Sequence, residues 1–372
     1  MGIAEARETI RSCRYCFLCR YACPTFQATR LESVTPRGYA LLLMEVDQGR
    51  KDWTPATVER FYQCTQCGLC RQICEYHWPE DELVQHARQA IVTAGQAPAN
   101  VVDLVADLIA RKNSTAGLKA ANGKPEISSP KIRLLYFAGC QALEQRMETV
   151  QANLTLLNAA GIEWDMLEEE ACCGAALFEL GYAQEARTAA QSLAKQITER
   201  QPDILLTGCA HCFRAFHEFY PDWEAGLPAG IQVVHTSQFF HTLVNSGRLR
   251  LRQDPDGVQA AYHDPCQLGR SMGIYEQPRH LIAAATGTAP LELFHNREVA
   301  ECCGGGGLMH RTQPEISRQV ARARLERVIE SGANTLVTAC QDCKTAFLNA
   351  QEGSSSQVKI VDLSELLSSS LA

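Results

Sequence analysis

Cysteine is the residue type most able to do chemistry in this chain, because its number and spacing are unusual. There are eighteen cysteines among 372 residues. A chain kept reduced in a cytosol has little use for many disulfides, and disulfide frameworks show scattered spacings rather than tight, repeated groups. The grouping therefore favours metal or redox chemistry over structural cross-links.

Two cysteine runs with the spacing C-x2-C-x2-C-x3-C lie in the first third of the chain, the first followed by Pro24 and the second by Glu75. This is the run of bacterial ferredoxins, in which three thiolates hold one [4Fe-4S] cube and the fourth serves the other cube. A four-cysteine zinc site needs only two C-x2-C pairs and would leave cysteines over, so zinc is the weaker alternative. The spacing predicts two cubane [4Fe-4S] clusters, one on Cys13, Cys16, Cys19 and Cys74, and the other on Cys64, Cys67, Cys70 and Cys23.

The remaining ten cysteines divide into two sets of five with one order: a lone cysteine, then Cys-Cys-Gly, then C-x2-C. The first set is Cys140, Cys172, Cys173, Cys209 and Cys212, and the second set is Cys266, Cys302, Cys303, Cys340 and Cys343. The flanking sequence repeats as well, since DILLTGCAHCFRAF matches NTLVTACQDCKTAF. The second part of the chain is therefore a duplication, and no cysteine is left outside a group.

The elements that must position the first two runs are helices. Thr-Pro start signals predict helices within residues 33–49 and 53–68, and residues 101–114 have apolar residues at helical spacing. Residues 113–130 are rich in Gly, Ser, Asn and Pro, which predicts a linker or, alternatively, an ordered loop packed on a partner. We expect a helical domain at 1–112 followed by a linker at 113–130.

Each repeat joins short apolar strands to cysteine turns, with helices predicted at 182–200 and 316–332 between the strands. Strands that alternate with helices favour a small parallel sheet, and such sheets place their sites at the carboxyl ends of the strands. We expect one α/β domain at 131–250 and a second at 251–372, with the cysteines at those strand ends.

At this point a resemblance becomes specific. The doubled C…CCG…C-x2-C pattern, with HDPCQLGR, ECCGGGG and TACQDCK, resembles the CCG domain pair of heterodisulfide reductase catalytic subunits. The pair is shared with the iron-sulfur subunits of glycolate oxidase, lactate-utilisation and anaerobic glycerol-3-phosphate dehydrogenase systems. With the two ferredoxin-type runs, the resemblance covers essentially the whole chain. It implies an α+β multidomain fold: a helical two-[4Fe-4S] ferredoxin domain, then two duplicated α/β CCG domains with small parallel sheets.

The resemblance also implies that each set of five cysteines holds a noncubane [4Fe-4S] cluster. Spacing alone does not separate this from a cubane cluster with a spare thiol. Gly174, Gly304 and Gly305 follow ligand pairs, where a Gly-rich turn brings backbone N–H groups close to sulfur. A nucleotide-binding loop is the weaker interpretation of the glycines, because no P-loop lysine follows them.

Two histidines lie beside the predicted ligands and are candidates for moving protons: His263 in HDPC, taken as the catalytic candidate, and His211 in CAHC. Loop orientation by hydrogen bonding is the alternative for each. We expect any direct substrate chemistry at the second set, because its glycines leave room for a ligand, whereas the first set continues into AALF.

The resemblance implies an electron-transfer subunit that serves a flavoprotein dehydrogenase, with a quinone or another carrier as acceptor and further iron-sulfur or membrane subunits as partners. No flavin or nicotinamide motif is found in the chain itself. The alternative is a reductase that cleaves a disulfide or persulfide at a noncubane cluster. A zinc-stabilised scaffold is the third class.

Composition narrows the cellular setting. The chain is 46% hydrophobic and 21% charged with a net charge of -7, which argues against a nucleic-acid partner. No apolar run approaches the ~18 residues of a membrane span, and the first residues lack a signal-peptide core. We expect a cytoplasmic protein that reaches a membrane only through a partner.

Overall fold

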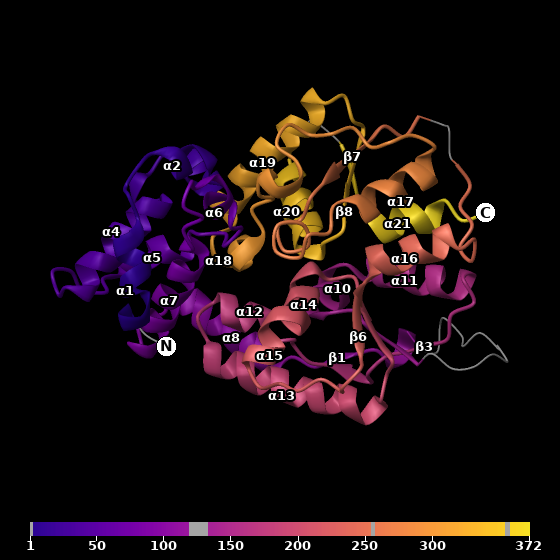
Figure 1. Cartoon of the computed structure of the whole chain (residues 1–372), viewed down its shortest axis with the longest axis horizontal. Coiled ribbons are helices and arrows are strands. Elements are labelled where there is room, and N and C mark those ends of the chain that lie inside the picture. The colour runs from indigo at the N-terminus through magenta and orange to yellow at the C-terminus, as the bar shows by residue number, and fades with distance from the viewer. Residues whose placement is uncertain (1–2, 119–132, 254–256, 354–357) are drawn as a thin grey trace.

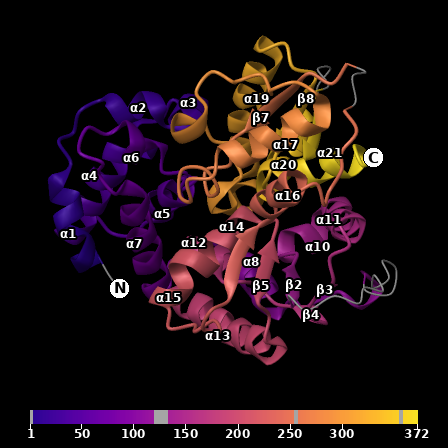
Figure 2. The same cartoon turned by 45° about the vertical axis from the view of Figure 1, so that its right-hand side comes forward.

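The computed structural model describes residues 3–118, 133–253, 257–353 and 358–372. Figure 1 shows a helical half beside two mixed units, and Figure 2 shows the same three parts turned by 45°. We call residues 1–112 the helical half, 131–250 the first repeat and 251–372 the second repeat.

The helical half contains no strand among its described residues. The Thr-Pro starts are confirmed: Thr35 caps α4 by accepting from the N–H of Gly38, and Thr54 caps α5 in the same way. Its helices are α1 (Ile3–Ser12), α2 (Leu18–Ala22), α3 (Pro24–Thr29), α4 (Pro36–Asp47), α5 (Pro55–Tyr62), α6 (Leu69–Ile73), α7 (Glu80–Thr93) and α8 (Ala99–Ala110), with a 3-10 turn, η1 (Glu32–Val34).

The first repeat is built on a four-stranded parallel sheet in the order β3-β2-β5-β6. Its strands are β2 (Leu134–Phe137), β3 (Trp164–Asp165), β5 (Ile204–Thr207) and β6 (Gln232–His235). Its helices are α10 (Cys140–Gln145), α11 (Met147–Ala159), α12 (Ala175–Glu179), α13 (Ala183–Arg200), α14 (Ala210–Arg214), the π-helical η2 (Ala215–Phe219), α15 (Tyr220–Asp222) and α16 (Thr236–Asn245).

The second repeat has a three-stranded parallel sheet in the order β7-β8-β9. Its strands are β7 (Ala260–His263), β8 (Thr335–Thr338) and β9 (Lys359–Asp362). Its helices are α17 (Glu276–Thr286), α18 (Met309–Thr312), α19 (Pro314–Glu330), α20 (Gln341–Gln351) and α21 (Leu363–Ser369), with 3-10 turns η3 (Arg297–Val299) and η4 (Gly306–Leu308). The predicted parallel sheets are thus confirmed in both repeats.

The start of the predicted linker belongs to the first repeat. Strand β1 (Asn113–Ser114) pairs antiparallel with β4 (Glu169–Glu170), and Thr115 is buried. Residues 113–118 are therefore ordered and pack on this chain. Residues 119–130 lie outside the described part of the chain.

Two apolar cores cross the predicted domain boundaries. Leu135 and Phe137 on one face of the first sheet share a core with the helical half, while Leu134 and Tyr136 on the other face share a core with the second repeat. Because side chains alternate across a strand, β2 contributes to both cores. The three parts are therefore packed as one body, and their cysteines are brought close together.

Among the described helices, none is both long enough and apolar enough to cross a bilayer.

Candidate iron-sulfur centres

The outer set is Cys13, Cys16, Cys19 and Cys74, and the structure brings these four together. All four line one cavity with Tyr76 and Trp78, and Cys16 is exposed to solvent. Burial raises the pKa of Cys19 to about 12. The pairing of Cys74 with the first run agrees with the predicted exchange of fourth ligands.

The inner set is Cys64, Cys67, Cys70 and Cys23, and it lies on the side toward the repeats. Burial raises the pKa of Cys23 well above its ordinary value, and the neighbouring Cys64 and Cys67 raise it further. Cys67 acts on Cys70 in the same way. Short helices α2 and α6 carry the last parts of the two runs and pack against each other, which holds the sets side by side.

A buried carboxyl group, Glu80 at the start of α7, lies between the outer and inner sets. Its side chain hydrogen-bonds with Cys70 and is also close enough to raise the pKa values of Cys13 and Cys23. Burial raises the pKa of Glu80 itself well above the ordinary value.

The first set gathers at the carboxyl ends of strands, as predicted. Cys140 follows β2 and Cys209 follows β5, and both open short helices. The thiols touch one another: hydrogen bonds from Cys172 and then Cys212 lower the pKa of Cys173 to about 6. Buried thiols in hydrogen-bond contact are close enough to bind the irons of one cluster once they lose their protons.

The second set repeats this arrangement with one exchange. Hydrogen bonds from Cys302 and then Cys343 lower the pKa of Cys303 to about 5, as in the first set. Cys140 contacts Cys172 in the first set, but the thiol in contact with Cys302 is Cys67 of the inner set. The inner and second sets are therefore in direct thiol contact.

Backbone N–H groups reach the sulfur atoms at the glycine turns. The N–H of Gly174 donates to Cys172 Sγ at 3.4 Å, that of Gly304 to Cys302 Sγ at 3.2 Å and that of Gly305 to Cys303 Sγ at 3.3 Å. Gly174 and Gly304 have φ of +92° and +85°, which glycine adopts without strain. Such donors raise the reduction potential of a bound cluster.

The expectation that glycines leave room for a ligand at the second set is wrong. A Cβ on Gly306 would lie 2.2 Å from the carbonyl oxygen of Thr65, and one on Gly307 would lie 2.9 Å from that of Cys64. The absent side chains make room for the backbone of the helical half. The second set is thus closed by the inner set.

A cavity lies instead over the first set. All five of its cysteines line the cavity, together with Glu144, His211, Arg311 and Asp342. Arg311 and Asp342 come from the second repeat, and Leu108 comes from α8, so three parts of the chain enclose the space. All five cysteines of the first set thus line one cavity, whereas Cys302 of the second set lines a separate one.

His211 lies between the two repeats. Its Nδ1 is 3.0 Å from Asp342 Oδ2 and its Nε2 is 3.5 Å from Glu179 Oε1, and the ring also hydrogen-bonds with Cys209 and Cys340. Although burial opposes it, the two carboxylates raise the pKa of His211 well above its usual range. The ring therefore touches one cysteine of each set of five.

His263 is brought to the second set, as its position at the end of β7 predicts. One of its ring nitrogens and the sulfurs of Cys303 and Cys343 lie within 4.8 Å of one another. The ring stacks edge-on against Phe347 and is buried, and neither nitrogen has a hydrogen-bond partner among the described residues. Burial, with help from Arg324, lowers its pKa to about 3. A neutral ring without a proton partner gives no support to the predicted proton transfer, which stays a prediction.

Two arginines that fix the inner set were missed. Arg88, fully buried on α7, donates to the carbonyls of Cys64, Phe61 and Glu179. Arg270 donates to the carbonyls of Cys67, Glu298 and Ala300 at 2.5–2.9 Å. No local pattern distinguishes such arginines from solvated ones.

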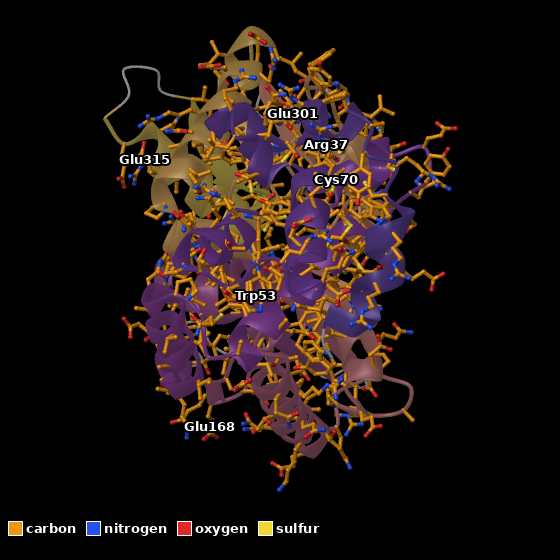
Figure 3. The ribbon with its side chains drawn as sticks, turned by 90° about the vertical axis from the view of Figure 1, so that its left-hand side faces the viewer. Arg37, Trp53, Cys70, Glu168, Glu301 and Glu315 are labelled. Atoms are coloured by element: carbon orange, nitrogen blue, oxygen red, sulfur yellow. The ribbon has the colours of Figure 1, made fainter. Side chains whose placement is uncertain are left out.

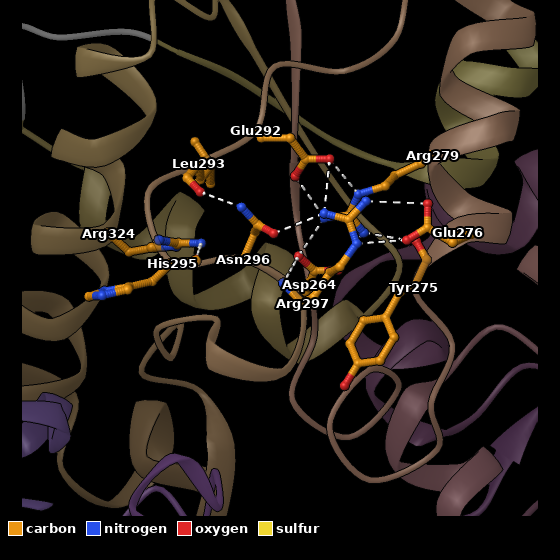
Figure 4. A network of polar contacts seen from close by, with 10 residues as sticks. All are labelled: Asp264, Tyr275, Glu276, Arg279, Glu292, Leu293, His295, Asn296, Arg297 and Arg324. Carbon is orange, nitrogen blue, oxygen red and sulfur yellow. Dashed lines mark hydrogen bonds and ion pairs between the residues drawn. The ribbon is translucent and has the colours of Figure 1, made fainter. Parts of the chain in front are cut away.

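A second polar network fixes the loop before Cys266. Arg279 forms a two-pronged ion pair with Asp264 at 2.7 and 2.9 Å and another with Glu292, and the N–H of Arg297 donates to Asp264 (Figure 4). Asp264 of the HDPC motif is thus a loop-positioning residue. The HDPC motif could have indicated this role, since it places an acidic residue two positions before a predicted ligand.

The donor groups fit iron-sulfur clusters. All eighteen cysteines are free, and in each of the four sets they converge without forming a disulfide. Four groups of soft sulfur donors, with backbone N–H groups aimed at sulfur in both repeats, suit iron-sulfur clusters better than hard cations. The assignment of individual ligands stays a prediction.

Comparison with known families agrees with these sets. Residues 9–78 match the family described as 4Fe-4S dicluster domain, and residues 134–217 and 260–348 each match the one described as cysteine-rich domain, CCG. The matched ranges contain the two runs and both sets of five.

Curated relatives match along nearly the whole chain. A component of the dihydromethanophenazine:CoB–CoM heterodisulfide reductase of Methanosarcina acetivorans is 28% identical over 97% of this chain and 93% of its own length. A component of the fumarate reductase (CoM/CoB) of Methanothermobacter marburgensis is 25% identical over 97% and 72%. The EtfAB:quinone oxidoreductase of Syntrophomonas wolfei is 26% identical over 83% and 46%.

A solved structure shares the fold. A hypothetical protein from Helicobacter pylori superposes with a TM-score of 0.59 at 9% identity, over 99% of this chain and 75% of its own.

Proposed function

We propose that this chain, which belongs to the CCG-domain iron-sulfur proteins, carries electrons within an oxidoreductase complex. It would link a flavoprotein dehydrogenase subunit to a quinone or another carrier. The names of its relatives support this, since they are components of heterodisulfide and fumarate reductases and a quinone oxidoreductase.

The observation that carries the proposal is the succession of the four cysteine sets. The outer and inner sets lie side by side in the helical half. Cys67 of the inner set contacts Cys302 of the second set, and His211 contacts Cys209 of the first set and Cys340 of the second. Iron-sulfur centres held there would form a series from an exposed entry to an accessible end. We assign cubane clusters to the helical half and noncubane clusters to the repeats.

Anaerobic affinity purification from the native host tests this function. The protein should retain a flavin-containing subunit, detected by flavin fluorescence, and reduction of that flavin by its substrate should reduce the iron-sulfur centres. Recovery of a fully iron-loaded chain with no flavoprotein, which still cleaves disulfides, would contradict the electron-transfer proposal.

Disulfide or persulfide reduction is a second candidate, favoured by the cavity over the first set. The same cavity favours the first set over the second as the site of this chemistry. Two electrons from the iron-sulfur series and two protons would convert one disulfide to two thiols. A reduced viologen dye supplies the electrons in an assay: turnover that is lost in Cys140→Ser supports this candidate, and its absence in the iron-replete protein removes it.

A further inference from the structure

The surface beside the outer set is unusually apolar for this molecule. We call Arg14, Cys16, Phe17, Leu18, Tyr21 and Tyr76 the outer-set face. Phe17 and Leu18 are each 51% exposed, Tyr21 is 71% exposed and Tyr76 is 68% exposed. Four of the eleven exposed large apolar side chains of the described chain therefore gather here. Figure 3 looks toward this end of the molecule, where Arg37 and Cys70 are labelled.

The face is continuous with the outer set. Arg14, Cys16, Leu18 and Tyr76 line the same cavity as the predicted ligands. Arginines cover the aromatic rings: Arg14 lies 5.8 Å from the ring of Tyr76, and Arg37 lies 4.1 Å from the ring of Phe17. Among the predicted ligands, Cys16 alone is exposed, so the outer set is the one that reaches the surface.

Its charge is opposite to that of the whole chain. Residues 9–31 contain four arginines and no acidic residue, although the chain has a net charge of -7. Glu32 is shared by Arg20 at 2.8 Å and Arg37 at 3.2 Å, and the buried Glu80 lines the cavity beneath the face. Within the part of the chain that is described, Arg11 and Arg14 have no ion pair.

We propose that the outer-set face docks an acidic electron-transfer protein, one whose redox cofactor has an apolar edge ringed by carboxylates. An apolar centre with a charged rim is the usual anatomy of a specific interface, and charge complementarity speeds encounter. The proposal rests on the proposed function. In the docked pair the partner's reduced cofactor loses one electron and the outer iron-sulfur centre gains it, so no further reactant is needed.

The other entrances support this choice. The inner set contacts the second set, and the cavity of the first set is lined by Glu144 and Asp342 as well as Arg311. Electron transfer between proteins needs both redox centres to lie near the contacting surfaces. The buried thiols of the inner and second sets do not meet this requirement. The outer-set face is the place where such an edge and a cationic rim coincide.

Reduced and oxidised flavodoxin, an acidic flavoprotein, is the probe. We expect the iron-loaded protein to bind oxidised flavodoxin at low salt, with a Kd that rises steeply with ionic strength. Arg14→Glu should weaken binding about tenfold, and Tyr76→Ala severalfold. The matched control is Arg252→Glu, an exposed arginine near the C-terminus, which should change the Kd less than about twofold.

Iron content and reduction by a small uncharged reductant separate the two proposals. If iron is low or the outer centre does not take an electron from the reductant, the proposed function fails. Two results would overturn the docking face while the outer centre is still reduced normally. One is flavodoxin binding that does not depend on salt, and the other is an equal loss of affinity in Arg14→Glu and Arg252→Glu. Hydrogen-exchange protection by flavodoxin over residues 14–21 is the expected footprint, and protection confined to the repeats overturns it too.

Discussion

The two repeats use the same five cysteines in the same order, yet their surroundings differ. In both, the Cys-Cys pair hydrogen-bonds with the C-x2-C pair and glycine N–H groups point at sulfur. The second set is closed by Cys67 and by the carbonyls of Thr65 and Cys64, whereas the first set faces a cavity. The difference lies in what packs against each copy.

Duplication has therefore produced two thiol sites with the same ligand order and different surroundings. The copy whose cysteines contact the inner set is suited to accept electrons from it. The copy that faces the cavity is suited to pass them to a molecule that enters it. Arg88 and Arg270 hold the first of these contacts together through carbonyl oxygens of the inner-set run.

Cys67→Ser gives the largest expected effect. Loss of the inner centre should remove about four of about sixteen irons. The EPR signal of the second set should change as well, because Cys67 contacts Cys302, while that of the first set stays the same. Cys16→Ser, on the exposed side of the outer set, is the control and should leave both repeats unaltered. If the EPR signal of the second set is identical in the two variants, the inner and second sets are not coupled as proposed.

Gly306→Ala should disturb the closed side of the second set. The new Cβ would lie 2.2 Å from the carbonyl oxygen of Thr65, so the helical half must shift. Overpacking of this kind costs about 1–3 kcal/mol, seen as a lower midpoint in thermal unfolding. Gly226→Ala has no atom within 4 Å of its Cβ and serves as control. Equal midpoints for the two variants would mean that the contact is loose.

Arg270→Met should shift the reduction potential of the inner centre to more negative values. The guanidinium donates to the carbonyl of Cys67, and its positive charge favours the reduced, more negative cluster. Arg270→Lys keeps the charge and should show a smaller decrease in the reduction potential. EPR-monitored redox titration measures it, with the outer centre as internal reference. A positive shift in Arg270→Met would contradict the role of the arginine.

The smallest effect concerns equivalent helix caps in the repeats. His235 caps α16 and Asp362 caps α21, each by accepting from the backbone N–H two residues on. Burial lowers the pKa of His235 to about 4 and raises the pKa of Asp362 to about 7, so both caps fold best in the neutral form.

The pH dependence of the two caps is therefore opposite. His235 should cost stability as pH falls from its ordinary value near 6.5 toward 4, and Asp362 should cost stability as pH rises from 3.8 toward 7. Between about pH 4 and 7, His235→Asn should remove a loss of stability that occurs as pH falls, and Asp362→Asn should remove a loss that occurs as pH rises. A change of the same sign in the pH dependence of the unfolding midpoint for both variants would contradict the assignment.

Much of the fold could be predicted from local sequence. Thr35 and Thr54 marked helix starts, and cysteines after apolar runs marked the ends of β2, β5, β7 and β8. These features depend on neighbouring residues, so spacing and capping chemistry reveal them.

The contacts between the parts were not predictable in the same way. Gly306 was interpreted as room for a ligand, because a glycine permits close approach without saying what approaches. The Cys67–Cys302 contact and the bonds of Arg88 join segments far apart in sequence, and no local pattern records them. The same limit led to the expectation of chemistry at the second set.

The most direct test of the account is metal analysis of the protein purified without oxygen. Four cysteine sets predict about sixteen irons and a similar amount of sulfide per chain. Cys140→Ser combined with Cys266→Ser should leave about eight of each, as two ferredoxin-type clusters require. Stoichiometric zinc with little iron, or an unchanged iron content in the double variant, would contradict the claim that both repeats hold iron-sulfur centres.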